Sequence, residues 1–399
     1  MKTLRKEETR VITGNAAAAY AAMLCRPDVI AIYPITPQSE VGEQLSRFRA
    51  DGVIDAEMVE VEGENSAMNV VAAAAACGSR VFTGTSSYGL VFMYDTILET
   101  AGRRVPVVMA NVNREPPGIL AVSCGQQDMI ATRDTGWIQL VVEDCQEILD
   151  TLIMSYRLAE DNDILLPVML NYDGYYLSFS AEAVKIPQRE DVDEYLAVLK
   201  KQPERIKLVP GVPRGCGTHG ILIGYTEMRY RHLEAMEKAK AKFDQIDQDF
   251  GAFFGRTYGG QIDEYQMADA ELVLVTSGSA AGSVRVAVDA GRATGIKVGM
   301  IKIRMYRPFP VEKLAQALKG RKAIGVLDRS VGFGWNSGPM YTEVRALAPE
   351  IGLVPFLSFI DGLANVDITL ANIEKMINLL QDAAAGKPYQ KTTWISLEE

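Results

Sequence analysis

The sequence predicts an α/β protein with two doubly wound domains. Short apolar runs alternate with segments rich in small residues, which is the pattern of a sheet with helices on both faces. The alternation starts near Thr13, and a second series starts near Ala268. With 399 residues the chain is long enough for two or three separate cores. We expect a domain at 1–248, a linker at 249–267 and a smaller domain at 268–399.

The elements of the first domain follow from apolar runs and their spacing. The helix at 65–77 consists mostly of Ala, Val and Met, so we expect it to be buried. The helix at 146–159 has an amphipathic pattern. The complete set of expected elements is helices at 16–25, 39–48, 65–77 and 146–159, and strands at 29–32, 81–83, 105–110 and 165–170.

Proline and glycine interrupt this pattern before the second domain. Residues 187–220 contain four of each, which predicts irregular structure. The charged stretch 226–248 then predicts a connecting helix on the surface. A smaller doubly wound series follows. Its expected elements are strands at 272–275, 298–303 and 323–327, and helices at 280–293 and 311–318.

Composition limits the classes of function. The net charge of −10 argues against a nucleic-acid surface, because no basic stripe neutralises phosphates. Five scattered cysteines without a C-x-x-C pair fit a reducing cytoplasm and provide no ligand set for an iron–sulfur cluster or a structural zinc. The polar N-terminus lacks the core of a signal peptide, and no apolar run reaches the roughly 20 residues that span a bilayer. We expect a cytoplasmic protein that binds neither nucleic acid nor membrane.

Four short motifs lie where predicted strands end and helices begin, the place where open α/β sheets hold their ligands. They are Tyr33–Pro37 (Y-P-I-T-P), Glu62–Ala67 (E-G-E-N-S-A), Thr83–Leu90 (T-G-T-S-S-Y-G-L) and Asn113-Arg114. Together they resemble the pyrimidine-binding domain of the 2-oxoacid:ferredoxin oxidoreductases, which use thiamine diphosphate. The R-P-F-P turn at 307–310 and Asp328-Arg329 resemble the C-terminal domain of transketolase-like enzymes.

This resemblance implies a pyrimidine-type thiamine-diphosphate-binding domain followed by a smaller transketolase C-terminal-like domain. It further implies the α subunit of a hetero-oligomeric 2-oxoacid:acceptor oxidoreductase. Such an enzyme decarboxylates a 2-oxoacid oxidatively, releases CO₂ and an acyl-CoA, and passes electrons to iron–sulfur clusters on partner subunits. The implied partners are a β subunit together with γ and ferredoxin-like subunits.

Glu64 stands immediately before the small-residue stretch. A carboxylate is electrostatically favoured near a helix N-terminus, so Glu64 could be a simple helix cap. The resemblance gives it another role, as the carboxylate that hydrogen-bonds the pyrimidine nitrogen N1′ of the coenzyme, and a dry pocket strengthens such a bond. Glu62 is expected to be a surface residue.

Thr36 lies in a turn whose backbone is restricted by Pro34 and Pro37. Arg114 follows a buried strand, where a guanidinium can pair with a carboxylate in bidentate fashion. Without context, Thr36 would cap the next helix and Arg114 would form a surface ion pair. The resemblance implies that both bind the carboxylate of the 2-oxoacid, and that Pro34 and Tyr88 contact the coenzyme.

After Arg114 the sequence departs from the family pattern. Many relatives carry an N-D-H or G-D-H stretch, whereas residues 115–118 read E-P-P-G and 124–128 read C-G-Q-Q-D. The family form returns at Arg133–Trp137. Because the departure falls near the substrate pocket, the substrate is expected to be pyruvate or an aromatic 2-oxoacid such as phenylglyoxylate.

The chain lacks one half of a thiamine site. That half needs a G-D-G motif followed roughly 25 to 30 residues later by Asn, to hold Mg²⁺ and the diphosphate. Asp-Gly occurs at 51, 173 and 361, but never within G-D-G. We therefore assign no metal ligand to this chain, and expect the coenzyme to be shared with a partner subunit. Mg²⁺ and the iron–sulfur clusters are expected on partner chains.

Two other functions stay open. One is a thiamine enzyme without electron-transfer subunits, such as a transketolase or a 2-oxoacid dehydrogenase component. The other is a non-catalytic subunit whose doubly wound domains bind a nucleotide. The second has little support, because no G-x-G-x-x-G follows a strand and Gly278–Gly282 reads as a tight turn rather than a phosphate cradle.

Overall fold

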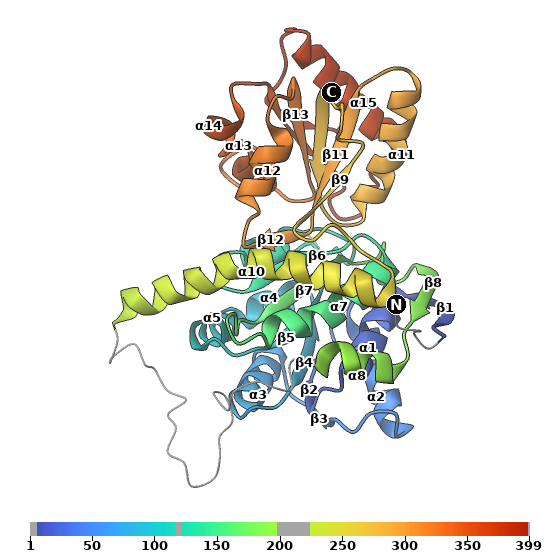
Figure 1. Cartoon of the computed structure of the whole chain (residues 1–399), viewed down its shortest axis with the longest axis vertical. Coiled ribbons are helices and arrows are strands. Elements are labelled where there is room, and N and C mark those ends of the chain that lie inside the picture. The colour runs from blue at the N-terminus through green and yellow to red at the C-terminus, as the bar shows by residue number, and fades with distance from the viewer. Residues whose placement is uncertain (1–5, 117–120, 198–223, 398–399) are drawn as a thin grey trace.

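Two α/β units lie one above the other along the long axis of the molecule (Figure 1), which is a computed structural model. The structure describes residues 6–116, 121–197 and 224–397. The lower unit contains a seven-stranded sheet and the upper unit a six-stranded sheet. The predicted α/β class with two doubly wound sheets is confirmed.

The seven-stranded sheet has the order β12-β6-β7-β5-β4-β2-β3. Its neighbours are parallel except for β12 and β6. The carboxyl ends of the parallel strands therefore meet at one edge of the sheet. The strands are β2 (Val29–Ala31), β3 (Glu57–Val59), β4 (Val81–Thr85), β5 (Val108–Asn113), β6 (Ile138–Val141), β7 (Val168–Asp173) and β12 (Met305–Arg307).

β5 and β7 begin three residues later than predicted and extend to Asn113 and Asp173. Their last residues are polar yet buried, and the amide of Asn111 donates to the amide oxygen of Asn171 on the neighbouring strand at 3.0 Å. The apolar run therefore ends before the strand does, which explains why both strands end later than predicted. Strand β6 had no predicted counterpart.

Helices cover both faces of this sheet. α1 begins after Thr13, whose hydroxyl accepts from the backbone N–H of Ala16 at 3.1 Å. Its first residue must be Gly14, because a Cβ there would lie 2.5 Å from the carbonyl oxygen of Leu177. The helices of this unit are α1 (Gly14–Cys25), α2 (Ser39–Ala50), α3 (Glu64–Ala76), α4 (Ser87–Phe92), α5 (Tyr94–Arg103), α6 (Gln127–Ala131), α7 (Cys145–Ala159) and α8 (Arg189–Leu196).

The predicted helix at 146–159 is present as α7, and all of its residues except Gln146 and Arg157 are buried, because other elements cover its outer side. The prediction for α3 is wrong. α3 is not fully buried, because Asn69 and Ala73 on its outer face are exposed, as is Cys77 directly after it. The inner face of α3 packs on β2 and β4.

The six-stranded sheet has the order β15-β14-β13-β10-β11-β9, and only β9 is antiparallel to its neighbour. α11 and α15 pack on one face, and α12 and α13 on the other. The predicted βαβ series is confirmed. The elements are β9 (Ile262–Tyr265), β10 (Leu272–Thr276), α11 (Ala280–Ala293), β11 (Val298–Ile303), α12 (Val311–Leu318), β13 (Ala323–Asp328), α13 (Pro339–Arg345), α14 (Ala348–Ile351), β14 (Phe356–Ile360), α15 (Leu370–Ala384) and β15 (Thr392–Trp394).

The long helix α10 (Tyr225–Phe254) runs across the lower unit (Figure 1). The predicted surface helix is present, but its inner face, which includes Phe243 and Phe250, packs against the lower unit. The expected linker at 249–267 contains the end of α10 and strand β9. The chain later returns to the lower sheet, where β12 pairs with β6. The domain limits at 248 and 268 stay a prediction.

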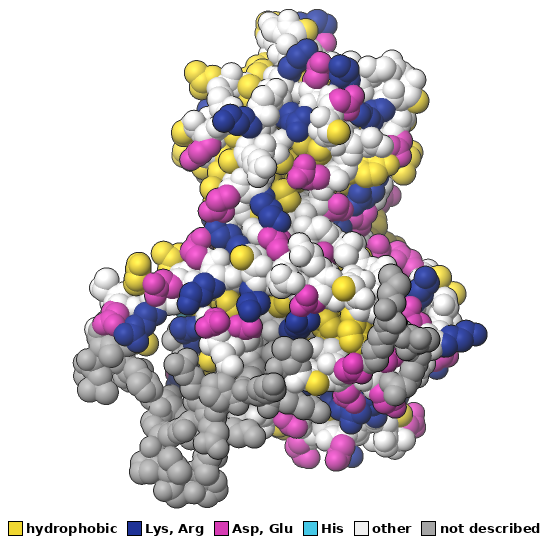
Figure 2. All heavy atoms as spheres, in the orientation of Figure 1, with side chains coloured by type: hydrophobic (Ala, Val, Ile, Leu, Met, Phe, Trp, Pro, Cys, Tyr) yellow, Lys and Arg dark blue, Asp and Glu magenta, His cyan; other side chains and the backbone are white. Residues whose placement is uncertain are grey.

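β1 (Glu8–Thr13) and β8 (Ala181–Ile186) pair to form a two-stranded antiparallel sheet. α8 occupies part of the segment expected to be irregular, and the rest of that segment, from 198 onward, lies outside the described residues. No helix in residues 6–116, 121–197 and 224–397 is long and apolar enough to span a bilayer. On the face shown in Figure 2, basic and acidic side chains are interspersed and no basic stripe forms.

Candidate active site

Glu64 is the first residue of α3 and is only 8 % exposed. Its carboxylate lies against Gly89 in α4: a Cβ on that glycine would stand 2.6 Å from Oε1 of Glu64 and 2.4 Å from Oγ1 of Thr85. Glu62, in contrast, is exposed and accepts a hydrogen bond from the Ser66 hydroxyl at 2.7 Å. Of the two acids in this motif, the structure buries the one expected to be functional.

Buried polar atoms without a partner occur around the end of β4, the strand that leads to Gly89. Oγ1 of Thr85 and Oγ of Ser86 are buried and have no hydrogen-bond partner among the described residues. The same holds for both amide atoms of Gln38, whose Nε2 lies 3.0 Å from the position of a Cβ on Gly84. A buried polar atom without a partner is costly, so such a group indicates a place where a ligand supplies the missing bonds.

Arg114 and Thr36 meet at the carboxyl edge of the sheet. Arg114 directly follows β5 and is 6 % exposed. Its Nη1 donates to the carbonyl oxygen of Thr36 at 2.9 Å, and its Nε donates to the carbonyl oxygen of Ala121 at 2.7 Å. Its guanidinium carbon lies 5.7 Å from the centre of the Tyr88 ring. Pro34 is exposed, two residues before Thr36.

Asp128 in α6 is a buried acid that sequence reasoning missed. Oδ2 accepts from the backbone N–H groups of Ser87 at 3.1 Å and Arg114 at 3.2 Å. Oδ1 accepts from Nδ2 of Asn113 at 2.9 Å and from the backbone N–H of Met129 at 2.8 Å. Burial raises the pKa of Asp128 to about 6, although these donors favour the charged form. Nothing in its short, polar surroundings singled it out in the sequence.

Glu115 is a second acid that the sequence did not identify. Its Oε2 is buried without a partner among the described residues. It fits only because residue 125 is glycine, since a Cβ there would lie 2.0 Å from Oε2. Burial, and then the charge of Asp128, raise the pKa of Glu115 to about 7. The unusual segment predicted after Arg114 therefore places a buried carboxyl close to Asp128; its residues 117–120 lie outside the described part of the chain.

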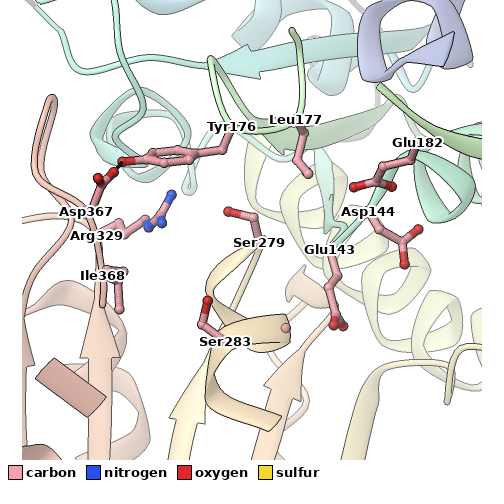
Figure 3. A pocket seen from close by; sticks show the side chains of 11 residues that line it. Glu143, Asp144, Tyr176, Leu177, Glu182, Ser279, Ser283, Arg329, Asp367 and Ile368 are labelled. Atoms are coloured by element: carbon pink, nitrogen blue, oxygen red, sulfur yellow. Dashed lines mark hydrogen bonds between the residues drawn. The ribbon is translucent and has the colours of Figure 1, made fainter. Parts of the chain in front are cut away.

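A cavity of about 470 Å³ lies between the two units (Figure 3). Tyr176 from the lower unit reaches across it to hydrogen-bond the carboxylate of Asp367 in the upper unit. Glu143, Asp144 and Glu182 line the opposite side. None of the predicted site residues lines this cavity, so it is separate from the cluster around Glu64 and Arg114.

The start of α11 is already occupied by a carboxylate. Oδ2 of Asp173 accepts from the backbone N–H of Ser279 at 2.9 Å and from its hydroxyl at 2.7 Å. Gly278 lies so close that a Cβ would stand 2.7 Å from the same oxygen. Because an acid holds the position that a phosphate would need, the structure favours the tight-turn interpretation of Gly278–Gly282 over a nucleotide site.

Two sequence profiles match the chain. One, described as pyruvate flavodoxin/ferredoxin oxidoreductase, thiamine diphosphate-binding, matches residues 20–248, which is more than half of the chain. The chain belongs to this oxidoreductase family. The second profile, pyruvate:ferredoxin oxidoreductase core domain II, matches residues 270–373.

Relatives that match almost the whole length of this chain are named as enzyme subunits. Pyruvate synthase subunit PorA of Methanothermobacter thermautotrophicus is 41% identical over 98% of this chain and 98% of that protein. PorA of Thermotoga maritima is 42% identical, covering 96% of each. The alpha subunit of NADH-dependent phenylglyoxylate dehydrogenase of Aromatoleum evansii is 38% identical over 94% of this chain and 92% of that protein.

Two solved structures share the fold. The 2-oxoglutarate:ferredoxin oxidoreductase of Magnetococcus marinus, solved with 2-oxoglutarate, coenzyme A and succinyl-CoA, gives a TM-score of 0.71 at 19% identity. The match covers 93% of this chain and 65% of that one. A split-gene transketolase, an inactive beta4 tetramer, gives a TM-score of 0.54 at 11% identity over 94% of this chain and 99% of that chain.

The residues around Glu64 fit a thiamine coenzyme, since they combine a buried carboxylate, unpaired hydroxyls and a glycine that leaves space beside them. Within the described parts of the oxidoreductase chain, no group of three or more His, Cys, Asp or Glu side chains could hold a metal ion.

Proposed function

We propose that this chain is the α subunit of a thiamine-diphosphate-dependent 2-oxoacid:acceptor oxidoreductase. The complex converts a 2-oxoacid and CoA into an acyl-CoA, CO₂, a proton and two electrons, and the electrons leave through iron–sulfur clusters on partner subunits. One observation carries this proposal: the Glu64 carboxylate is buried against Gly89 at the start of α3, within the segment that matches the thiamine-binding profile.

Glu64 is assigned to the coenzyme. When bound, thiamine diphosphate supplies the carbon nucleophile for decarboxylation. Glu64 holds a proton between its carboxylate and the pyrimidine nitrogen, and its burial strengthens this hydrogen bond. Gly89 leaves the space that the carboxylate needs. Tyr88 contributes to the wall of this site, and Pro34 restricts the turn that leads to Thr36.

Arg114 and Thr36 are assigned to the carboxylate of the 2-oxoacid. Arg114 uses Nε and Nη1 for the carbonyl oxygens of Ala121 and Thr36, which fixes the guanidinium plane. A guanidinium has five N–H groups, so others can donate to a carboxylate. Because Arg114 is nearly buried, its attraction for an anion is screened less than at a surface.

A β subunit completes the site with the diphosphate and Mg²⁺, and γ and ferredoxin-like subunits carry the iron–sulfur clusters. The support for a partner here is the surface next to Glu64. Val91, Phe92 and Tyr94 are 45%, 62% and 41% exposed, and the ring of Phe92 stands beside Gly63, the residue before Glu64. Clustered exposed apolar side chains mark surfaces that another protein covers.

The change Glu64→Gln tests this assignment, with Glu62→Gln as its matched control. Glutamine keeps the shape but loses the charge, so the assembled E64Q complex should lose thiamine-dependent decarboxylation by at least about a hundredfold, within the typical range for acid–base catalysis. E62Q should keep wild-type turnover, because Glu62 is exposed. Wild-type turnover in E64Q would contradict the proposal.

The substrate is pyruvate or an aromatic 2-oxoacid, as the names of the relatives suggest. The purified complex should reduce a dye acceptor with CoA and one member of a panel that includes pyruvate, 2-oxoglutarate and phenylglyoxylate. Its visible spectrum distinguishes the alternative: iron–sulfur absorption accompanies an acceptor oxidoreductase, whereas a transketolase or a dehydrogenase component is colourless.

A further inference from the structure

One buried carboxylate joins both halves of the candidate site. Asp128 is fully buried and is not assigned to coenzyme or substrate. Its Oδ2 accepts from the backbone N–H of Ser87, which begins α4, and from the backbone N–H of Arg114, which directly follows β5. α4 carries Tyr88 and Gly89, so Asp128 connects the segment beside Glu64 to the arginine at the sheet edge.

The connection to α4 holds a strained residue. Ser87 has a φ of 46°, in the left-handed region that non-glycine residues seldom adopt. Such a conformation persists only where the surroundings fix it. Two hydrogen bonds do so: its N–H donates to Asp128 at 3.1 Å, and its hydroxyl donates to the carbonyl oxygen of Glu115 at 3.1 Å. If the first bond is lost, Gly89 is free to move away from Glu64.

We propose that Asp128 is a positioning residue that holds α4 and Arg114 in a fixed relation, so that coenzyme and 2-oxoacid bind side by side. This inference rests on the proposed function. Asp128 acts through Gly89 on the coenzyme side and through Arg114 on the substrate side, and it touches neither ligand.

The geometry requires a carboxylate and not an amide. Each oxygen of Asp128 accepts from at least two N–H donors. Ser87, Arg114 and, at 3.5 Å, Asn111 donate to Oδ2, and Asn113 and Met129 donate to Oδ1. In an Asp128→Asn variant, the amide nitrogen faces two donors whichever way the side chain is flipped. The variant therefore cannot restore the network by rotation, and one side of the site must open.

The experiment compares Asp128→Asn with Asp247→Asn in the assembled complex. Asp247 is a similar buried carboxylate that accepts from the backbone N–H groups of Tyr258, Gly259 and Gly260 at 3.1–3.2 Å. It also pairs with Arg304 at 3.3 Å, and lies in α10, outside the candidate site. D128N should raise KM for the 2-oxoacid at least tenfold. D247N should lower thermal stability about as much as D128N does, but it should leave KM within twofold of the wild-type value.

A double-mutant cycle with Arg114→Lys distinguishes positioning from a general loss of stability. If Asp128 acts through Arg114, the increase in KM caused by R114K should be much smaller in D128N than in wild type. Independent, multiplicative effects would overturn the inference. An unchanged KM in D128N would also overturn it. In both cases, turnover of a 2-oxoacid by the wild-type complex would leave the proposed function intact.

Hydrogen exchange on the wild-type complex keeps the inference testable even if D128N does not assemble. The amide hydrogens of Ser87 and Arg114 should exchange slowly, because both are bonded to Asp128 inside the protein. Fast exchange at either amide would overturn the inference. If the wild-type complex oxidises no 2-oxoacid, the proposed function fails, and the exchange data alone decide whether Asp128 anchors the two segments.

Discussion

Gly89→Ala is the most selective perturbation of the candidate site, because it adds one methyl group at a known place. The new Cβ would stand 2.6 Å from Cγ and Oε1 of Glu64, and 2.4 Å from Oγ1 of Thr85. Ordinary contact starts at 3.4 Å, so the Glu64 carboxylate must retreat by about 0.8 Å or α4 must shift. A displacement near 1 Å at a reacting centre costs roughly a hundredfold in rate.

The expected result for the G89A complex is therefore a fall in kcat/KM of about a hundredfold, together with a loss of about 1–3 kcal/mol of stability from overpacking. Gly102→Ala is the matched control. Gly102 is also a helical glycine, in α5, and a Cβ there would meet nothing within 4 Å. Alanine at that position should stabilise the helix by about 0.5–1 kcal/mol and leave activity unchanged. The reasoning is refuted if G89A and G102A turn over the 2-oxoacid at equal rates.

Two further predictions concern the buried charges of the upper unit. Arg329→Met removes the ion-pair partner of the fully buried Asp173, which lies 3.2 Å from Nη1, so we expect the free energy of unfolding in urea to fall by about 3–5 kcal/mol. Arg47→Met is the control, because Arg47 forms an exposed pair 3.9 Å long and its loss should cost less than about 1 kcal/mol. Equal losses in the two variants would contradict this reasoning. Burial raises the pKa of Asp328 from 3.8 to about 7, so its contribution to stability is present below pH 4 and is lost as the pH rises through about 7. The free energy of unfolding should therefore depend less steeply on pH between pH 4 and 7 in Asp328→Asn than in wild type. An unchanged slope would mean that another group causes the pH dependence.

Most elements with a clear apolar period could be predicted from the sequence. The limits of α11, β11 and α12 agree with the predicted ranges, because the apolar residues of each mark the element in the sequence. β5 and β7 were predicted too early in the chain. Their ends carry Asn111, Asn113, Asn171 and Asp173, whose burial depends on partners in other strands and loops. No local pattern reveals such partners.

The burial of α7 also depends on distant partners. The sequence predicts an amphipathic helix here, and its acidic residues Glu147 and Asp150 are both buried in the fold. Nε of Arg304 binds Glu147 at 2.6 Å and Nε of Arg256 binds Asp150 at 2.6 Å, so the charges are paired by residues more than 100 positions away. A polar residue marks a surface only if no distant partner exists, and the sequence does not show where that partner is.

The candidate site could be predicted only in part, for a related reason. Glu64, Thr36, Arg114 and Tyr88 lie in short motifs at strand ends, and those motifs are readable in the sequence. The roles assigned to them stay predictions. Asp128 and Glu115 could not be found in this way, because what distinguishes them is burial and the donors around them.

The outer face of α3, which was wrongly predicted to be buried, is a candidate contact surface in the proposed complex. An alanine-rich helix was expected to be buried, and within this chain its face at Asn69 and Ala73 is open to solvent. Val91 and Phe92 in α4, the helix that packs against α3, are exposed as well. Small side chains such as that of Ala73 allow another backbone to approach closely, which agrees with the proposal that a partner subunit covers this helix. If a partner subunit covers this face, as proposed above, the prediction was wrong only for the isolated chain, and the partner would lie on the helix that begins with Glu64.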